Sequence, residues 1–405
     1  MVNSSLLPFI YVQVIFLNNL HTLLSESLAQ LASSGLARRR HKLESSCGRT
    51  VIVDGRSLLN FASNDYLGLA NHPDIAQAIA HGATHWGAGS GASHLVSGHL
   101  VPHDELEQNI ARFVGFPSAL TFSTGYLANL AVTPTLAGRG TAIFADKLNH
   151  ASLIDAMQLA KANGAKVQRY PHKDVQTLER QLSNSTAGTK LIVTDSVFSM
   201  DGDLAPLPAL LELAEQFDAW LIIDDAHGFG VLGPQGEGAL AHFGLLPSHR
   251  VLLMGTLGKA AGVAGAFVAG SELAIEYLLQ KGRSYIFTTA APPSIACGLT
   301  TSLKLIETGT PLRANLFANI KNLQEGLRGS PHHLLPSPTA IQPLIIGENQ
   351  AALTLSNALW EQGIWVPAIR PPTVPAGTAR LRISISAAHT EADIQQLVTA
   401  LKELA

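Results

Sequence analysis

The chain has 405 residues, of which 46% are hydrophobic and 14% are charged, and these values predict two or three domains with a large core. A net charge of −3, with no basic block longer than Arg38–Arg40, argues against nucleic-acid binding. Its two cysteines, Cys47 and Cys297, cannot form a disulfide framework, which indicates a reducing, cytoplasmic location. The histidines and cysteines show no metal-binding spacing, so no metal site is predicted.

The N-terminus begins with an apolar stretch, Leu6–Leu17. This stretch is shorter than the about 20 residues that span a bilayer. No lysine or arginine precedes Arg38, so the basic region of a signal peptide is missing. We interpret residues 1–24 as an extension and residues 25–60 as an N-terminal segment of the folded protein, and we expect no membrane association.

A glycine-rich loop is predicted at Trp86–His99. Its Gly87–Ala92 part superficially matches a dinucleotide-binding fingerprint, which must follow a strand. The preceding residues, Pro73–Trp86, instead have the pattern of a helix. We therefore interpret the stretch as a flexible loop near an active site or a subunit contact.

Short apolar runs alternate with amphipathic stretches from Ser118 onward. Strands that are apolar throughout, separated by helices such as Pro206–Phe217, are typical of a mainly parallel sheet covered on both faces. The fold class is therefore α/β, with a large domain predicted over residues 61–295. The predicted strands are 118–122, 141–145, 190–198, 220–225, 250–255 and 265–270.

The last hundred residues have a different pattern, with fewer strands and helices. Strands are predicted at 340–347, 364–370 and 380–386, and helices at Asn349–Gln362 and from Thr390 to the end. These elements predict a smaller α+β domain over residues 296–405. We place the boundary near Pro292–Ser302.

Lys259 lies among small residues in "GTLGKAAG", Gly255–Gly262. A nucleotide-binding loop would need glycine at Leu253 and Ser or Thr at Ala260, so that interpretation fails. Two interpretations stay open. Lys259 is a solvated loop residue, or it is a partly desolvated amine that can form a Schiff base with a flat carbonyl cofactor.

The apolar strand predicted at 220–225 ends in two acids, Asp224 and Asp225, and His227 follows shortly after it. In an open α/β sheet, ligands gather at the carboxyl ends of the strands. Either acid could simply cap the following turn. The alternative is that one carboxylate faces a ring nitrogen of a cofactor such as pyridoxal phosphate.

Three further strand ends carry candidate binding groups. The helix predicted from Gly125–Tyr126 offers backbone N–H groups to a phosphate, unless Ser123 or Thr124 merely caps it. His150 is either a structural histidine or an imidazole stacked on a cofactor ring. Ser199 either contacts a ring oxygen or belongs to the turn that follows it.

Four sequence blocks are similar to the signature blocks of one known family: "NFASNDYLGLANHP", "TDSVFSMDGD", "DDAHGFGVLG" and "GTLGKAAG". From about Ser25 onward the chain resembles the α-oxoamine synthases of the aspartate-aminotransferase fold. This resemblance implies a pyridoxal 5'-phosphate-dependent enzyme of fold type I. It also implies a homodimer with active sites at the subunit interface.

The same resemblance implies a role for each candidate residue. Lys259 matches the Schiff-base lysine, Asp224 the partner of the ring nitrogen, and His227 the neighbour of the ring hydroxyl. His150 matches the histidine that stacks on the ring. Ser199 and Thr256 match further cofactor contacts, and the backbone amides of Gly125 and Tyr126 match the phosphate site.

Two further blocks, "GASHLVSGHLVPHDELE" and Ala368–Thr390, resemble the family branch that joins L-alanine to a pimeloyl thioester of CoA or acyl carrier protein in biotin synthesis. By this resemblance Arg382 binds the alanine carboxylate, and Arg38, Thr373 and His150 contact substrate. Without it, Arg382 would be a solvated strand residue and Arg38 part of a basic helix end.

Two rival functions are weighed against this one. The first is a sibling enzyme that uses glycine with acetyl-CoA or succinyl-CoA. The second is a non-catalytic scaffold subunit, which would be expected to lose Lys259, whereas Lys259 is present. The chain departs from the family pattern at Asp195, where some members carry glutamate, and this puts the role of Asp195 in doubt.

Overall fold

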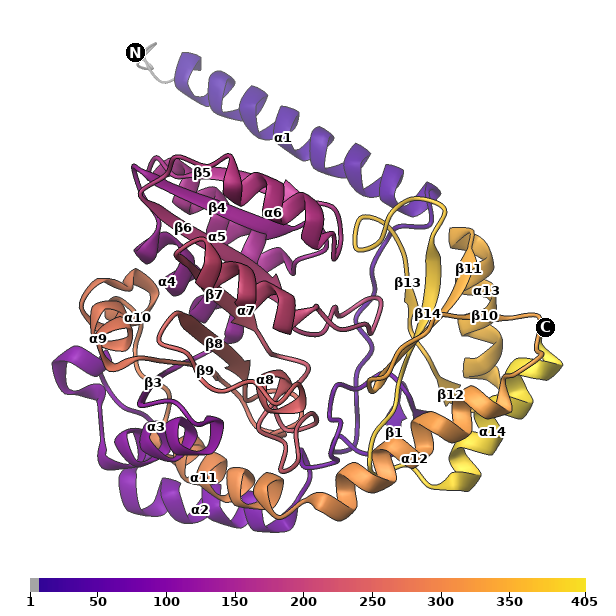
Figure 1. Cartoon of the computed structure of the whole chain (residues 1–405). Helices are drawn as coiled ribbons and strands as arrows, with labels where there is room; N and C mark the ends of the chain where they lie inside the picture. Colours follow the sequence, from indigo (N-terminus) through magenta and orange to yellow (C-terminus); the bar gives the residue numbers. More distant parts are fainter. Residues whose placement is uncertain (1–6) are drawn as a thin grey trace.

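The computed structural model describes residues 7–405, with side chains from residue 19 onward (Figure 1). Residues 1–6 of the predicted extension, and all side chains of its apolar stretch Leu6–Leu17, lie outside the described part. Helix α1 (Leu7–Ser33) runs across the boundary predicted at residue 24, and all its described side chains are exposed. Within the described residues, no helix combines the length and the apolar character that a bilayer crossing requires.

A seven-stranded sheet with the order β3-β9-β8-β7-β6-β4-β5 forms the larger part of the molecule. Neighbouring strands are parallel, except that β9 is antiparallel to both β3 and β8. The predicted α/β class is confirmed. The strands are β3 (Ser118–Phe122), β4 (Thr141–Asp146), β5 (Lys166–Tyr170), β6 (Thr189–Asp195), β7 (Ala219–Asp224), β8 (Val251–Thr256) and β9 (Ala266–Gly270).

All six strands predicted for this sheet are present, with one misplaced end and one omission. The run 190–198 continues past the strand, because β6 ends at Asp195 and the chain then turns back through a bridge between Val197 and Leu204. Strand β5 was not predicted. It lies at the sheet edge, where Lys166, Gln168 and Arg169 do not have to be apolar.

Helices cover both faces of this sheet, in two separate apolar layers. One layer packs α4 (Gly125–Leu136), α5 (Ala151–Ala162), α9 (Glu272–Lys281) and α10 (Arg283–Ile286) against one face. The other packs α3 (Val101–Val114), α6 (Val175–Ser183), α7 (Leu207–Gln216) and α8 (Ala239–His242) against the opposite face. Burial on both faces explains why the central strands are apolar throughout.

A four-stranded antiparallel sheet, β10-β11-β14-β13, forms the smaller part. The single strand predicted at 364–370 is wrong. Pro367 has no N–H to continue a ladder, and the segment divides into β12 (Ile364–Trp365) and β13 (Ala368–Ile369), which join different sheets. The other elements are β10 (His333–Leu334), β11 (Ile341–Gly347), β14 (Ala379–Ser384), α12 (Thr310–Gly326), α13 (Asn349–Glu361) and α14 (Glu391–Glu403).

The N-terminal segment joins this smaller part. β1 (Thr50–Val53) and β2 (Arg56–Asn60) form a hairpin, and β12 adds to it in parallel. Helix α11 (Pro293–Glu307) packs on α2 (Pro73–Trp86) and α3, whereas α12 packs on α14 (Figure 1). The boundary predicted near Pro292–Ser302 lies inside α11, and the predicted domain limits stay a prediction.

Candidate functional site

A chain of hydrogen bonds connects Lys259 to the smaller part of the molecule. Lys259 Nζ lies 2.9 Å from His227 Nε2, and His227 Nδ1 lies 2.7 Å from the Tyr66 hydroxyl. The Tyr66 hydroxyl donates to Asn64 Oδ1 over 3.1 Å. This order makes His227 accept from the lysine and donate to the tyrosine, so its proton is assigned to Nδ1.

Burial sets the protonation of this chain. It lowers the pKa of Lys259 to about 8, because the charge of Asp224 only partly offsets the loss of hydration and Arg382 adds to the lowering. Burial, with the nearby charges of Lys259 and Arg382, also holds the pKa of His227 well below its usual value. Near neutral pH the imidazole is therefore neutral, and a usable share of the lysine is a neutral amine.

The two acids at the end of β7, Asp224 and Asp225, have different surroundings. Asp224 Oδ2 accepts from Asn129 Nδ2 over 2.8 Å, and its Oδ1 accepts from the backbone N–H of Ala226 over 3.0 Å. Asp225 points into the core, where it accepts from the Ser196 hydroxyl and from the N–H of Ala239. Asp225 therefore supports the loop, and Asp224 is the acid whose charge acts on Lys259.

Asp195 and Asp224 end neighbouring strands in register. Asp195 Oδ2 accepts from the backbone N–H of His150 over 2.7 Å. Burial and the adjacent charge of Asp224 raise the pKa of Asp195 well above its usual range. The two carboxyl groups therefore resist being ionised together. Asp195 has a defined role as the acceptor for the His150 N–H at the start of α5.

His150 precedes α5 and is its N-cap. Its Nδ1 accepts from the N–H of Ser152 over 3.2 Å and lies 2.7 Å from the Ser152 hydroxyl, which leaves Nε2 as the protonated nitrogen. Loss of hydration lowers the pKa of His150, with opposite contributions from Asp224 and Lys259. These charge effects place His150 in the same site as Lys259.

The start of α4 closes another side of the site. Thr124 caps this helix, since its hydroxyl accepts from the N–H of Leu127 over 3.2 Å. The capping alternative is therefore confirmed, and phosphate binding by the amides of Gly125 and Tyr126 stays a prediction. A Cβ on Gly125 would lie 3.5 Å from Met254 and 3.9 Å from Thr256, so α4 begins against the end of β8. The Tyr126 side chain is exposed, and its hydroxyl donates to Asp155.

Arg382 reaches the site from β14 and is only 5% exposed. Its Nε donates to the Ser199 carbonyl over 2.7 Å, and its Nη1 donates to Asn64 Oδ1 over 3.0 Å. Its Nη2 lies 3.4 Å from the Tyr66 hydroxyl. Across the described part of the chain, no carboxylate lies within ion-pair distance of this guanidinium, whereas Arg380 on the same strand is paired with Asp201.

The remaining predicted site residues lie farther out. Thr373 is exposed and shares with Ser199 the lining of a cavity of about 150 Å³. Arg38 is exposed, and its charge acts on Arg370. The hydrogen bonds described above connect neither Arg38 nor Thr373 to Lys259.

Three residues of the site were not predicted: Tyr66 and Asn129, which are buried, and Asn64, which is partly buried. Asn64 and Tyr66 lie inside the quoted block "NFASNDYLGLANHP", which marks the segment but does not reveal their partners. Asn129 follows Gly125 by one helical turn, a spacing that could have indicated a side chain facing the same strand end.

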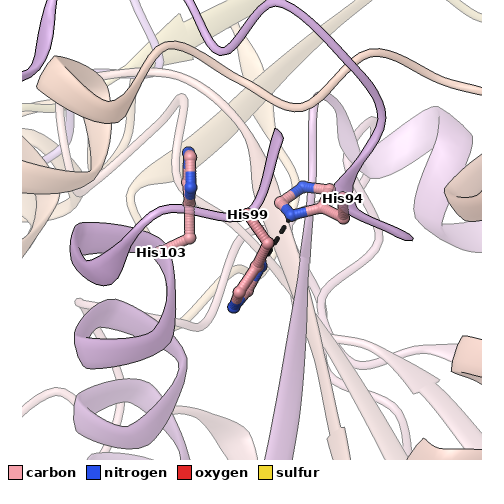
Figure 2. A group of neighbouring side chains, drawn as sticks. All are labelled: His94, His99 and His103. Atoms are coloured by element: carbon pink, nitrogen blue, oxygen red, sulfur yellow. Dashed lines mark hydrogen bonds between the residues drawn. The ribbon is translucent and has the colours of Figure 1, made fainter. Parts of the chain in front are cut away.

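Two histidines of the glycine-rich loop, His94 and His99, cluster with His103 at the start of α3 (Figure 2). The Nδ1 atoms of His94 and His99 lie 2.8 Å apart. Both nitrogens of His103 bind backbone, since Nδ1 accepts from Leu100 and Nε2 donates to Ala291. The cluster therefore fixes the loop against residue 291, and His103 has no ring nitrogen free for a metal ion. The preceding segment is helix α2, as predicted.

This site, a lysine beside three strand ends of a mixed α/β sheet, agrees with the comparison of the sequence with known families. The model of the family "Aminotransferase class I and II" matches residues 56–401. The chain belongs to this family.

More specific relatives narrow the class. The chain is 74% identical to an 8-amino-7-oxononanoate synthase of Dechloromonas aromatica (strain RCB), over 94% of this chain and 99% of that protein. The solved structure of an 8-amino-7-oxononanoate synthase from Francisella tularensis is 33% identical, with a TM-score of 0.74 over 85% of this chain and 97% of that one. A lysine-to-alanine variant of a serine palmitoyltransferase from S. paucimobilis, solved with a bound PLP-myriocin aldimine, is 31% identical, with a TM-score of 0.88 over 96% of this chain and 98% of that one.

Two variants are predicted to shift the pKa of Lys259 in opposite directions. In protein freed of bound ligands, the amine of Lys259 should titrate near pH 8. Asp224→Asn should lower this value, because it removes a negative charge that favours the ammonium form. Arg382→Met should raise it, because it removes a positive charge.

The measurement is the rate at which Lys259 reacts with an amine-acylating reagent as a function of pH, read from the mass of its peptide. Exposed lysines in the same digest serve as the internal reference. Shifts of the same sign in both variants would contradict the assignment of the surrounding charges.

Proposed function

We propose that the chain catalyses the pyridoxal phosphate-dependent condensation of L-alanine with a pimeloyl thioester, which yields 8-amino-7-oxononanoate, carbon dioxide and a free thiol in biotin biosynthesis. The observation that carries this proposal is a buried lysine amine, with a pKa of about 8, between Asp224 and an arginine without a carboxylate partner in the described chain. The named relatives, at up to 74% identity, support the choice of reaction.

The residues of the site fit the cofactor. Lys259 offers an amine, Asp224 a buried carboxylate, and the start of α4 offers backbone N–H groups. In this proposal Gly125, Tyr126 and Thr256 hold the phosphate, while His150, Ser199 and His227 contact the ring. When bound, pyridoxal phosphate supplies a carbonyl that takes up amino groups and a ring that withdraws electrons from the adjacent carbon.

Lys259 is proposed to act as the base. A group with a pKa near the working pH can both remove and return a proton, and the Lys259 amine meets this condition. The neutral His227 accepts a hydrogen bond from Lys259 Nζ and so holds the amine in one direction. The role of the lysine is to take the proton from the α-carbon of alanine and to return one to the product.

Arg382 is proposed to bind the carboxylate of alanine. Nε and Nη1 are fixed by Ser199 and Asn64, so the guanidinium has a set orientation before substrate arrives. The buried charge has no partner among the described carboxylates, and burying an unpaired charge is costly. A substrate carboxylate would supply that partner. Arg38 and Thr373 are proposed to contact the acyl substrate farther out.

The test of the function is product formation. Purified holoenzyme with L-alanine and pimeloyl-CoA or pimeloyl-acyl carrier protein should release 8-amino-7-oxononanoate, identified by mass spectrometry. Lys259→Ala should abolish turnover while the fold, followed by circular dichroism, is retained. Product formed instead from glycine and a short acyl-CoA would replace the proposed substrates and leave the cofactor assignment in place.

Arg382 separates the two substrates. A hydrogen bond to a charged group contributes ~1.5–3 kcal/mol, so Arg382→Ala should weaken alanine use by roughly tenfold to 150-fold. Arg382→Lys should recover only part of the loss, because an ammonium lacks the forked geometry of the guanidinium. Affinity for the pimeloyl thioester should change little. An equal loss for both substrates would exclude the carboxylate role.

We also propose that the chain acts as a cytoplasmic homodimer. In support, the described part of α1 exposes leucines at helical spacing, including Leu20, Leu24, Leu28 and Leu31, which are 43–66% exposed. Sedimentation at micromolar concentration should give a dimer. An active monomer would contradict this prediction.

A further inference from the structure

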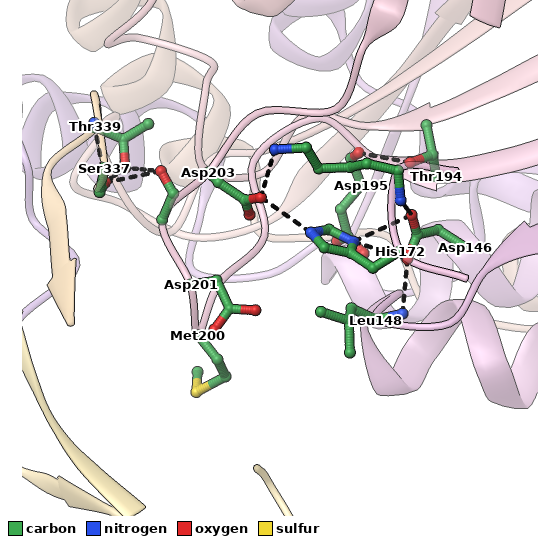
Figure 3. Close-up of polar contacts among 12 residues, drawn as sticks. Asp146, Leu148, His172, Thr194, Asp195, Met200, Asp201, Asp203, Ser337 and Thr339 are labelled. Carbon is green, nitrogen blue, oxygen red and sulfur yellow. Dashed lines mark hydrogen bonds and ion pairs between the residues drawn. The ribbon is translucent and has the colours of Figure 1, made fainter. Parts of the chain in front are cut away.

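His172 lies between two carboxylates and contacts both (Figure 3). Its Nδ1 is 3.1 Å from Asp146 Oδ1, and its Nε2 is 2.9 Å from Asp203 Oδ2. The Asp146 carboxylate is 2% exposed, and the imidazole is 24% exposed. The ring also meets the Phe198 ring edge to face, with 4.3 Å between the ring centroids.

The contacts define the protonation of His172. Ionised carboxylates only accept hydrogen bonds, so both ring nitrogens must carry protons and the ring is an imidazolium. Burial alone would lower the pKa of His172, but the hydrogen bonds and charges of Asp146 and Asp203 raise it to about 9. The other charged groups near the ring are Lys173, whose Nζ is 2.8 Å from Asp203 Oδ2, and Asp201, which is paired with Arg380.

Asp146 connects His172 to the turn that carries His150. The same carboxylate accepts from the backbone N–H of Leu148 over 2.8 Å and from that of Lys173 over 2.8 Å. Leu148 lies in the turn between β4 and His150, the N-cap of α5. The position of this turn therefore depends on a carboxylate that His172 holds.

Asp203 connects His172 to the hairpin closed by the bridge between Val197 and Leu204, here called the Ser199 hairpin. This hairpin contacts two arginines of β14, Arg380 and Arg382. The backbone carbonyl of Asp203 accepts from Phe198, which closes the hairpin. Within it the Ser199 carbonyl accepts from Arg382 Nε. Asp201, in the same hairpin, pairs with Arg380 of β14. The position of Arg382 therefore depends on the second carboxylate that His172 holds.

We infer that the His172 imidazolium is a positioning group that fixes the His150 turn and the Ser199 hairpin relative to each other, and so sets where Arg382 presents its guanidinium to alanine. His172 acts through these two carboxylates and not by contact with substrate. The inference rests on the proposed function, since it takes alanine as the ligand of Arg382.

The sign of the pH dependence follows from the raised pKa. The bridge is complete below about pH 9 and loses one of its two bonds as the pH rises through that value. For the wild-type holoenzyme, kcat/KM for alanine should therefore contain an alkaline step near pH 9. His172→Gln, which cannot be a cation, should lack this step and should already show an about fivefold to thirtyfold lower kcat/KM for alanine at pH 7.5.

Two further variants make the test specific. Asp203→Asn removes one charge that favours the imidazolium, so it should move the alkaline step to lower pH. Lys173→Gln removes the neighbouring cation and leaves the imidazolium with both carboxylates, so it should keep the step and change kcat/KM for alanine less than about twofold. The KM for the pimeloyl thioester should stay within about twofold in all three variants. The titration of alanine itself is common to all of them, and that of Lys259 is followed in each variant by the acylation measurement.

An unchanged alkaline step in both His172→Gln and Asp203→Asn, or an equal loss in Lys173→Gln, would overturn the inference. If His172→Gln does not fold, Asp203→Asn alone decides through the direction of its shift. The proposed function fails separately, when the wild-type enzyme forms no product from alanine and a pimeloyl thioester.

Discussion

The chemistry of this site depends on one buried amine whose charge is only partly compensated. Loss of hydration and the charge of Arg382 both disfavour the ammonium form of Lys259. The charges of Asp224 and Asp195 favour it, and the resulting pKa is about 8. Each of these groups comes from a different element, at the end of β6, β7 or β8 or on β14. The mixed sheet and the smaller sheet must therefore be held in a fixed relation for the amine to have this pKa.

Near the site, polar contacts help to hold that relation, beside an apolar core that includes residues of both sheets. Tyr66 contacts both His227 and Arg382, and Asn64 accepts from both Tyr66 and Arg382. These residues follow β2, which itself pairs with β12 near the C-terminal part of the chain. The N-terminal segment thus connects the two parts, and a change in its position would move the tyrosine and the arginine together.

The sequence predicted those features that local pattern determines. Apolar runs identified six strands of the large sheet, and the small residues around Lys259 identified the lysine. The pattern could not tell Asp224 from Asp225, because they are neighbours at the end of the same strand and only their contacts differ: Asn129 for the first, Ser196 and Ala239 for the second.

Contacts between distant residues were also beyond local reasoning. Tyr66 and His227 are 161 residues apart, and no spacing rule relates them. Strand β5 was missed because an edge strand needs no continuous apolar run. The strand expected at 364–370 failed for the opposite reason: an apolar run was present, but Pro367 cannot continue a ladder.

The two arginines of β14 show how the site prepares for an anion. Arg380 is paired with Asp201, whereas Arg382, two residues along the same strand, has no carboxylate partner among the described residues, and its charge lowers the pKa of Lys259. Under the proposed function, the carboxylate of alanine would neutralise Arg382. That neutralisation would remove one of the contributions that lower the pKa, so Lys259 would become more basic when the substrate is in place. Arg382 would then both orient alanine and adjust the base that acts on it.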